Sequence, residues 1–275
     1  MTETERHGRL APRFVEGTAG PIHVMSFLPE VDDPKGVLVV AQALAEEANK
    51  SRRMVALLAR ALQAQGWATV VPDMYGTGDS SGDFADADWG VWVADFCQIV
   101  AFQARHFRVR PTLLGVRHGA LVVAEALADV DLSSHIVFWQ PVTLGSQALT
   151  QFLRLRMAAA LTTERRETVA DLREALKRGE GVEVAGYKLS PQLAEAIDQA
   201  SLSPPYCGGT LDCFAVASQA RNGLPPALKK VLEDWQLTGW STGAHLVSGD
   251  AFWGTQEISI VPELVHRTVE AVTTR

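Results

Sequence analysis

Residues 113–121 combine residue types and a spacing that could carry hydrolytic chemistry. An apolar run ends in Gly115-Val116-Arg117-His118-Gly119, and an apolar helical pattern follows directly. Two glycines around a central residue permit a tight turn from strand to helix, which is how a nucleophile elbow presents a catalytic Ser, Cys or Asp. Here the central residue is Arg117, whose guanidinium stays protonated and cannot attack a carbonyl carbon.

The other two members of a serine-type triad can be sought by their order along the chain. The acid is expected after a late strand, in residues 218–222, and the base in the loop formed by residues 248–257. The first segment contains no Asp or Glu, and the second contains no His. His245 is predicted to begin the last strand, at the opposite end of the sheet from the elbow. The sequence therefore predicts a site without an ordinary Ser-His-Asp triad.

Three further residues could act beside the elbow. His118 follows Arg117 and could face the same pocket, although a lone histidine more often packs or hydrogen-bonds inside a protein. Glu46 and Glu47 lie in the loop that normally supplies an oxyanion N–H, where a carboxylate would oppose the developing charge. Because an unpaired buried charge costs several kcal/mol, we expect at least one of these acids within about 4 Å of Arg117. The other acid would then be free to activate a water molecule.

A second loop, residues 72–84, reads PDMYGTGDSSGDF. Its glycines and short polar side chains suit a tightly turned loop. Bracing of the fold is the interpretation that this composition favours, with a place on the pocket rim as the alternative.

The elements that must position these residues alternate along the chain. β-Branched runs without polar alternation indicate strands buried on both faces. Such strands are predicted at residues 37–40, 67–71, 112–114 and 135–139, with helices at 51–65, 89–106 and 121–128. This rhythm predicts an α/β fold with a doubly wound, mostly parallel sheet. The alternating residues near Phe14 and at 22–27 predict an antiparallel edge.

The second half of the chain predicts an insertion in the sheet. Residues 146–205 carry helical Leu and Ala spacing with interleaved charges, which a solvated helix face explains. We interpret this segment as a helical lid within one domain, residues 1–275. Strands are predicted again at 211–217 and 245–247, and helices at 226–235 and 262–273.

Composition excludes several classes of protein. Among the 275 residues 47% are hydrophobic, within the range of about 45–50% for globular proteins, and the net charge is −7, which disfavours binding to nucleic-acid phosphates. The chain has no uninterrupted apolar run long enough to span a membrane and no secretory signal. Three cysteines are too few and too scattered for a disulfide framework or a zinc site. We expect a cytoplasmic protein with no metal and no cofactor.

Four segments together resemble one known group: residues 45–54 (AEEANKSRRM), 72–84, 115–120 and 252–258 (FWGTQEI). They are similar to the type 2 hydrolases associated with the bacterial exosortase A system, within the α/β-hydrolase superfamily. The resemblance covers nearly the whole chain from about Pro12, and an arginine at the elbow matches the group. It implies the α/β-hydrolase fold and a cytoplasmic protein encoded beside exopolysaccharide and protein-sorting functions.

These segments carry the candidate site residues. The catalytic candidates are Glu46, Glu47, Arg117 and His118. The substrate-binding candidates are Asn49, Arg52, Asp79, Ser80, Trp253 and Gln256.

Two functions stay open at this point. One is hydrolysis or transfer of an ester, thioester or glycan-linked acyl group, with Glu46 or Glu47 as general base. The other is a non-catalytic binding or scaffold protein that holds an anionic ligand through the planar fork of Arg117. The expected partner in the first case is a small acylated or glycan-linked substrate, and a homodimer is compatible with both.

Overall fold

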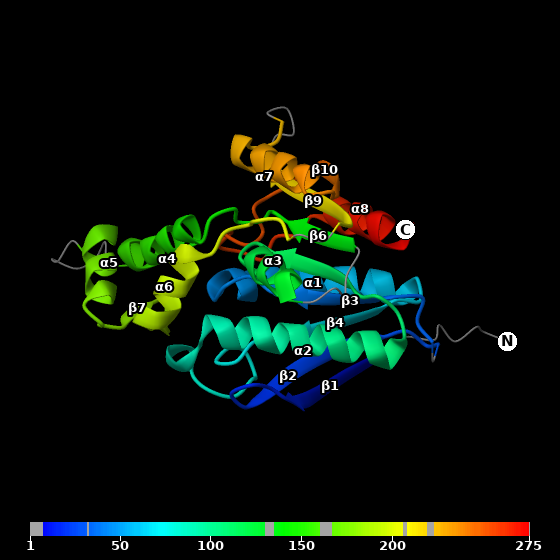
Figure 1. Ribbon diagram of the computed structural model, residues 1–275, viewed down its shortest axis with the longest axis horizontal. Helices are drawn as coiled ribbons and strands as arrows, with labels where there is room; N and C mark the ends of the chain where they lie inside the picture. Colours follow the sequence, from blue (N-terminus) through cyan, green and yellow to red (C-terminus); the bar gives the residue numbers. More distant parts are fainter. Residues whose placement is uncertain are drawn as a thin grey trace.

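Eight strands form one central sheet in the order β1-β2-β4-β3-β5-β6-β9-β10 (Figure 1). The computed structural model describes residues 8–31, 33–129, 135–159, 167–205, 208–218 and 223–274. The strands of the sheet are β1 (Arg9–Glu16), β2 (Pro21–Leu28), β3 (Val37–Ala41), β4 (Ala68–Pro72), β5 (Thr112–Val116), β6 (His135–Trp139), β9 (Thr210–Ala217) and β10 (Ser241–Ser248).

Strand direction follows the sequence pattern. β1 pairs with β2, and β2 with β4, in antiparallel fashion. The strands from β4 to β10 in the sheet order are all parallel. Every residue of β3, β5 and β6 is buried, as expected for strands covered on both faces. The predicted doubly wound, mostly parallel sheet with an antiparallel edge is confirmed.

Helices cover both faces of the sheet. One layer consists of α2 (Trp89–Phe107), α3 (Gly119–Asp129) and α7 (Pro226–Leu237), and the other of α1 (Glu46–Ala64) and α8 (Pro262–Thr273). Alternate strand residues serve the two layers: Val39 packs in the core with α2, and Leu38 in the core with α1. The parallel strands are thereby held rigidly, with their carboxyl ends at one edge of the sheet.

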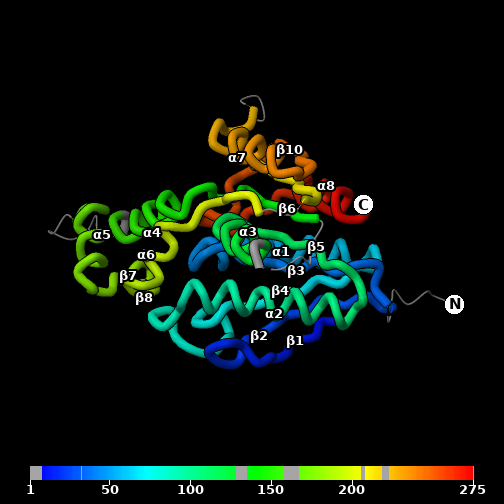
Figure 2. Tube along the Cα trace, viewed as in Figure 1, coloured from blue at the N-terminus to red at the C-terminus, as the bar shows by residue number. Residues whose placement is uncertain are grey.

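An insertion separates β6 from β9. It contains α4 (Gly145–Ala159), α5 (Val169–Lys177), β7 (Val182–Val184), β8 (Tyr187–Leu189) and α6 (Pro191–Gln199), gathered at the end of the molecule farthest from α8 (Figures 1 and 2). Its base is closed by backbone bonds from Gly145 N to Ala200 O at 2.8 Å and from Leu202 N to Thr143 O at 3.0 Å.

The sequence predicted a helical insertion, but the structure contains a β-hairpin as well as helices there. β7 and β8 form an antiparallel hairpin with three residues in each strand. Its turn places Ala185 and Gly186 at φ 49° and 86°. Strands of three residues are too short to show the period-two alternation from which a strand is predicted.

Two predicted boundaries were wrong in ways that affect the site. Helix α1 begins at Glu46, not near Ser51, and Ala45 before it has φ 50° and no side-chain cap. His245 does not begin β10 but is its fifth residue. Within the described residues, no helix combines the length and the apolar character that crossing a membrane requires.

Candidate functional site

The turn between β5 and α3 has the geometry of a nucleophile elbow. Arg117 at its centre has φ 54°, in the left-handed region that non-glycine residues rarely adopt. A Cβ at Gly119 would collide with the carbonyl oxygen of Ala41, and one at Gly115 would lie 2.5 Å from the Cα of Ala120. The two glycines are therefore required for the close approach of helix, turn and neighbouring strand.

The Arg117 guanidinium is bonded inside the protein. Its Nε and Nη2 donate to the two carboxylate oxygens of Glu47 at 3.2 and 3.0 Å. Nη1 donates to the Gln140 carbonyl at 3.0 Å, and Nη2 also donates to Gln151 Oε1 at 3.2 Å. The Trp253 ring covers the group, 4.8 Å from the guanidinium carbon. The predicted contact between Arg117 and one of the two acids is thus confirmed, with Glu47 as the partner.

Both acids occupy the first turn of α1. Acidic side chains there interact favourably with the positive end of the helix dipole. The doubled acid therefore has a structural cause that does not depend on Arg117. Glu46 lies beside the ion pair, and its Oε1 is 3.4 Å from Asn49 Nδ2.

His118 is buried under the elbow, with 3% of its surface exposed. Its ring makes edge-to-face contacts with Trp89 and Trp92, with ring centres 5.2 and 6.2 Å away. Burial, and then the adjacent Arg117 charge, lower its pKa from 6.5 to about 4. His118 is therefore neutral near pH 7. Its Nε2 atom is buried and has no hydrogen-bond partner among the described residues.

Two pockets open on either side of His118. The apolar pocket has a volume of about 170 Å³ and includes Glu46, Glu47, Lys50 and Gln151 at its polar side. Its apolar wall consists of Leu44, Val142, Ala148, Phe152, Leu155 and Trp253. The polar pocket has a volume of about 60 Å³, and one wall of it consists of Gln42, Asn49, Arg52, Asp73, Thr77 and Tyr187. The rest of its lining is mainly apolar and includes Ala41, Ala43, Met74, Trp92 and Val122. Leu44 and His118 line both.

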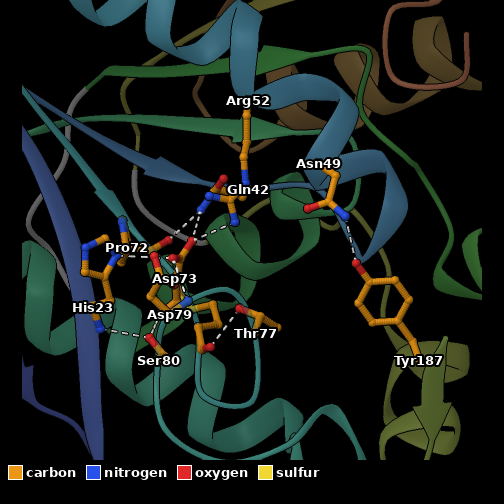
Figure 3. A network of polar contacts seen from close by, with 11 residues as sticks. His23, Gln42, Asn49, Arg52, Pro72, Asp73, Thr77, Asp79, Ser80 and Tyr187 are labelled. Carbon is orange, nitrogen blue, oxygen red and sulfur yellow. Dashed lines mark hydrogen bonds and ion pairs between the residues drawn. The ribbon is translucent and has the colours of Figure 1, made fainter. Parts of the chain in front are cut away.

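Asp73 organises one wall of the polar pocket (Figure 3). Its Oδ1 accepts from Gln42 Nε2 at 2.9 Å and lies 3.6 Å from Arg52 Nη2. Its Oδ2 accepts from the Asp79 backbone N–H and lies beside His23 Nδ1, both at 3.2 Å. The opposite wall is formed by Asn49, whose Nδ2 donates to Tyr187 Oη at 2.8 Å.

The structure separates the remaining candidates. Ser80 braces the loop, because its hydroxyl donates to the Asp73 carbonyl at 2.5 Å and accepts from the His23 N–H at 2.8 Å. Asp79 and Gln256 are exposed, and neither lines the two pockets. Ligand atoms of His23, Asp73 and Asp79 lie within 4.8 Å of one another, as in a metal site, yet both Asp73 oxygens already accept protein N–H groups.

Sequence reasoning missed several residues that complete the site. Gln140, directly after β6, supplies a carbonyl to Arg117, and its Oε1 accepts from the Val216 N–H at 2.7 Å. Its position at the carboxyl end of a parallel strand was an available signal. Gln151 and Tyr187 belong to the insertion, whose helices the sequence predicted but whose packing against the site it did not.

The expected triad positions can be followed only in part. In the segment expected to hold the acid, residues 219–222 lie outside the described residues, and Ser218 follows β9. His245 Nε2 bonds to Asp212 Oδ1 at 2.8 Å, while His135 Nε2 bonds to Oδ2 at 3.0 Å. Asp212 is the third residue of β9 and His135 the first of β6, toward the amino ends of those strands. His245, the fifth residue of β10, pairs in register with Phe214, which pairs with Trp139 at the carboxyl end of β6.

The sequence was compared with models of known protein families and with curated proteins. Residues 32–178 match the family model described as serine aminopeptidase, S33. No curated protein matches the chain.

Similar solved structures extend over almost the whole chain. Est1E from Butyrivibrio proteoclasticus with ferulic acid bound has a TM-score of 0.67 at 14% identity and covers 95% of this chain and 98% of its own. XC6422 from Xanthomonas campestris, described as a serine hydrolase without a lid, has a TM-score of 0.56 at 16% identity and covers 97% and 94%. At such low identity these likenesses show the fold alone, which is the α/β-hydrolase fold expected from the sequence.

Proposed function

This chain belongs to the serine aminopeptidase S33 family of α/β hydrolases, and we propose that it hydrolyses or transfers an acyl group held in an ester or thioester, without an acyl-enzyme at the elbow. The ion pair between Arg117 and Glu47 carries this proposal. It fills the elbow with a side chain that cannot act as a nucleophile, while two pockets remain open beside it.

Water replaces the missing nucleophile in the proposed reaction. Its oxygen attacks the acyl carbon, and Glu46 accepts the released proton as general base. The bond from the acyl carbon to the leaving oxygen or sulfur breaks, and that atom takes up a proton. Glu46 suits this role because it lines the apolar pocket and is not part of the Arg117 ion pair.

His118 has a different role in this proposal. It stays neutral above about pH 4, so it can hydrogen-bond to the substrate or the water without carrying charge. Arg117 acts as a positioning residue, because its bonds to Glu47, Gln140 and Gln151 hold α1, the β6 loop and α4 around the pocket.

The wider setting rests on the resemblance to the exosortase A-associated hydrolases. It supports an acyl group linked to exopolysaccharide biosynthesis, a cytoplasmic location and the absence of a cofactor. Est1E with ferulic acid bound, an aromatic carboxylic acid, supports an acyl-type ligand. We further propose that the insertion at residues 146–205 serves as a lid on a single domain. Light scattering of the purified protein would show whether it is a homodimer.

The mechanism is tested by measuring turnover and by trapping with hydroxylamine. Purified protein is assayed against acyl esters, thioesters and acylated sugars, together with Glu46→Gln and the control Glu257→Gln. We expect turnover that falls at least tenfold in Glu46→Gln and is unchanged in the control. Transfer of acyl to hydroxylamine at a rate independent of its concentration would reveal a covalent intermediate and contradict the proposal.

Ligand binding without turnover is the second candidate function. It is favoured by the same ion pair, since Glu47 uses both carboxylate oxygens on Arg117. Arg117 makes four N–H contacts to the protein, which leave little of its guanidinium for an anionic ligand. The variant Arg117→Gln therefore distinguishes ligand binding through Arg117 from ligand binding elsewhere in the site. Equal affinity of wild type and Arg117→Gln for a bound anion would remove Arg117 from ligand recognition.

A further inference from the structure

We infer that the substrate has two unlike halves: a short apolar acyl group that fills the apolar pocket and an uncharged, hydroxyl-bearing alcohol that enters the polar pocket. This inference rests on the proposed function and specifies its substrate class. Its basis is the set of hydrogen-bonding side chains on one wall of the polar pocket, the apolar wall of the other pocket, and the position of His118 in the lining of both.

The apolar pocket sets the size of the acyl half. Six apolar side chains form its wall, among them Phe152, which is buried, and Leu155, which is partly exposed. A cavity of about 150 Å³ lined by apolar side chains can bind one benzene molecule. The volume of about 170 Å³ therefore suits a short acyl chain or one aromatic ring.

The charges of the polar pocket favour an uncharged partner. The Arg52 guanidinium and the Asp73 carboxylate lie 3.6 Å apart and offset each other. His118 adds no charge near neutral pH, because its pKa is lowered to about 4. A ligand carboxylate would compete with Asp73 for Arg52, and a ligand cation would compete with Arg52 for Asp73. A hydroxyl group avoids both conflicts.

The bonding groups of the polar pocket match a hydroxyl for a second reason. A hydroxyl both donates and accepts, and the pocket offers both kinds of partner. Arg52 has a half-exposed side chain with N–H groups to donate, and Asn49 retains a carbonyl oxygen beside the amide that bonds Tyr187. Tyr187 Oη accepts the Asn49 N–H and still has its own proton to donate. These side chains line the polar pocket, and Figure 3 shows them together.

The small size of the polar pocket limits what enters it. Its volume of about 60 Å³ is that of roughly two water molecules at about 30 Å³ each. It can take a hydroxyl-bearing carbon of a glycerol or sugar, with the rest of the alcohol outside. Because Leu44 and His118 line both pockets, the ester bond that joins the two halves would lie beside His118.

Binding is tested with ethers, which cannot be hydrolysed. Calorimetry compares 1-O-butylglycerol with butyl propyl ether, which has the same carbon skeleton and lacks the two hydroxyls. We expect the glycerol ether to bind about tenfold more tightly. Tyr187→Phe and Asn49→Ala should each weaken its binding about threefold to tenfold, the effect of one lost hydrogen bond, and leave butyl propyl ether unaffected. The control Lys188→Ala changes an exposed residue of the same hairpin outside the pocket.

The acyl half is tested by filling the apolar pocket. Ala148→Phe should weaken binding of both butyl ethers alike, so that the preference for the glycerol ether persists. Equal affinity of the two ethers for wild type, or no binding of either, would overturn the inference.

Turnover is measured separately with glyceryl monobutyrate and propyl butyrate. If the ethers bind with the expected preferences and neither ester is hydrolysed, the proposed hydrolysis is wrong and the two-pocket inference stands. If both esters are hydrolysed with equal kcat/KM, and Tyr187→Phe changes neither, the inference is wrong and the hydrolysis stands.

Discussion

Arg117 and Glu47 form a bidentate ion pair between the strand–helix turn and the first turn of α1. Arg117 Nε and Nη2 donate to the two carboxylate oxygens of Glu47 at 3.2 and 3.0 Å. The Arg117 side chain is 9% exposed and that of Glu47 is 27% exposed. This pair takes the place of a nucleophile and fixes two walls of the site relative to each other.

Loss of this pair should destabilise the protein. Arg117→Ala leaves Glu47 without its partner in a largely buried position, so we expect a loss of about 3 kcal/mol, the lower end of the range of about 3–5 kcal/mol for broken buried pairs. Urea denaturation measures the loss. Arg178→Ala is the matched control, because Arg178 forms the same kind of bidentate pair with Glu180 on the surface. Similar midpoints for the two variants would show that the Arg117 pair is not a buried one.

The pKa of His118 predicts how stability depends on pH. The unfolded chain binds a proton on this residue near pH 6.5, whereas the folded protein does so only near pH 4. Between these values the unfolded state holds more protons, so the free energy of unfolding falls as the pH decreases. At 1.36 kcal/mol per pKa unit the fall attributable to His118 is about 3 kcal/mol. Below pH 4 this contribution no longer changes.

The contribution of His118 is isolated by comparing variants. Denaturant titrations at pH 4.5, 5.5 and 7 are expected to give a shallower pH dependence for His118→Gln than for wild type. His266→Gln, which changes a histidine with 69% side-chain exposure, should keep the wild-type slope. A His118→Gln slope equal to wild type would show that folding does not lower the pKa of His118.

No serine in the chain should be hyper-reactive. The elbow residue is Arg117, and Ser80 uses its hydroxyl on the Asp73 carbonyl. We expect a fluorophosphonate probe to leave the protein without a stoichiometric adduct by mass spectrometry, while a serine hydrolase treated in parallel is labelled. A single labelled serine, such as Ser51 or Ser80, would contradict this prediction.

The elbow glycines should not tolerate a side chain. In Gly119→Ala the new methyl group would overlap the Ala41 carbonyl oxygen, a backbone atom that cannot move without shifting β3. We expect a loss of stability of about 1–3 kcal/mol, typical of overpacking in a rigid core, measured as a lower midpoint of thermal unfolding. Gly90→Ala is the control, since its methyl group would meet only the Asp88 side chain at 3.3 Å. An unchanged midpoint in Gly119→Ala would show that the turn can relax.

Sequence patterns predicted Val37–Ala41 and Trp89–Phe107 well, because the strand is a continuous apolar run and the helix carries its apolar periodicity in the local sequence. The Arg117 partnership with an acid of α1 was predictable, because a buried charge needs a counter-charge and strand order brings the two segments together. The contributions of Gln151 and Tyr187 to the site were not predictable from the sequence. Both depend on how the insertion folds back over the sheet, and that packing leaves no periodic signal in either segment.

The bonding of the elbow bears on where the molecule can open. Arg117 N donates to Trp139 O at 2.9 Å, its carbonyl accepts from Val142 N at 3.2 Å, and its side chain is held by three other residues. Regions that admit ligands usually come from the least stable parts of a protein. In this chain the strand–helix turn is held by both backbone and side-chain hydrogen bonds of Arg117. We expect the motions that let a ligand in and out to occur in the β7–β8 hairpin, which an exposed hydrogen bond from Asn49 to Tyr187 joins to α1.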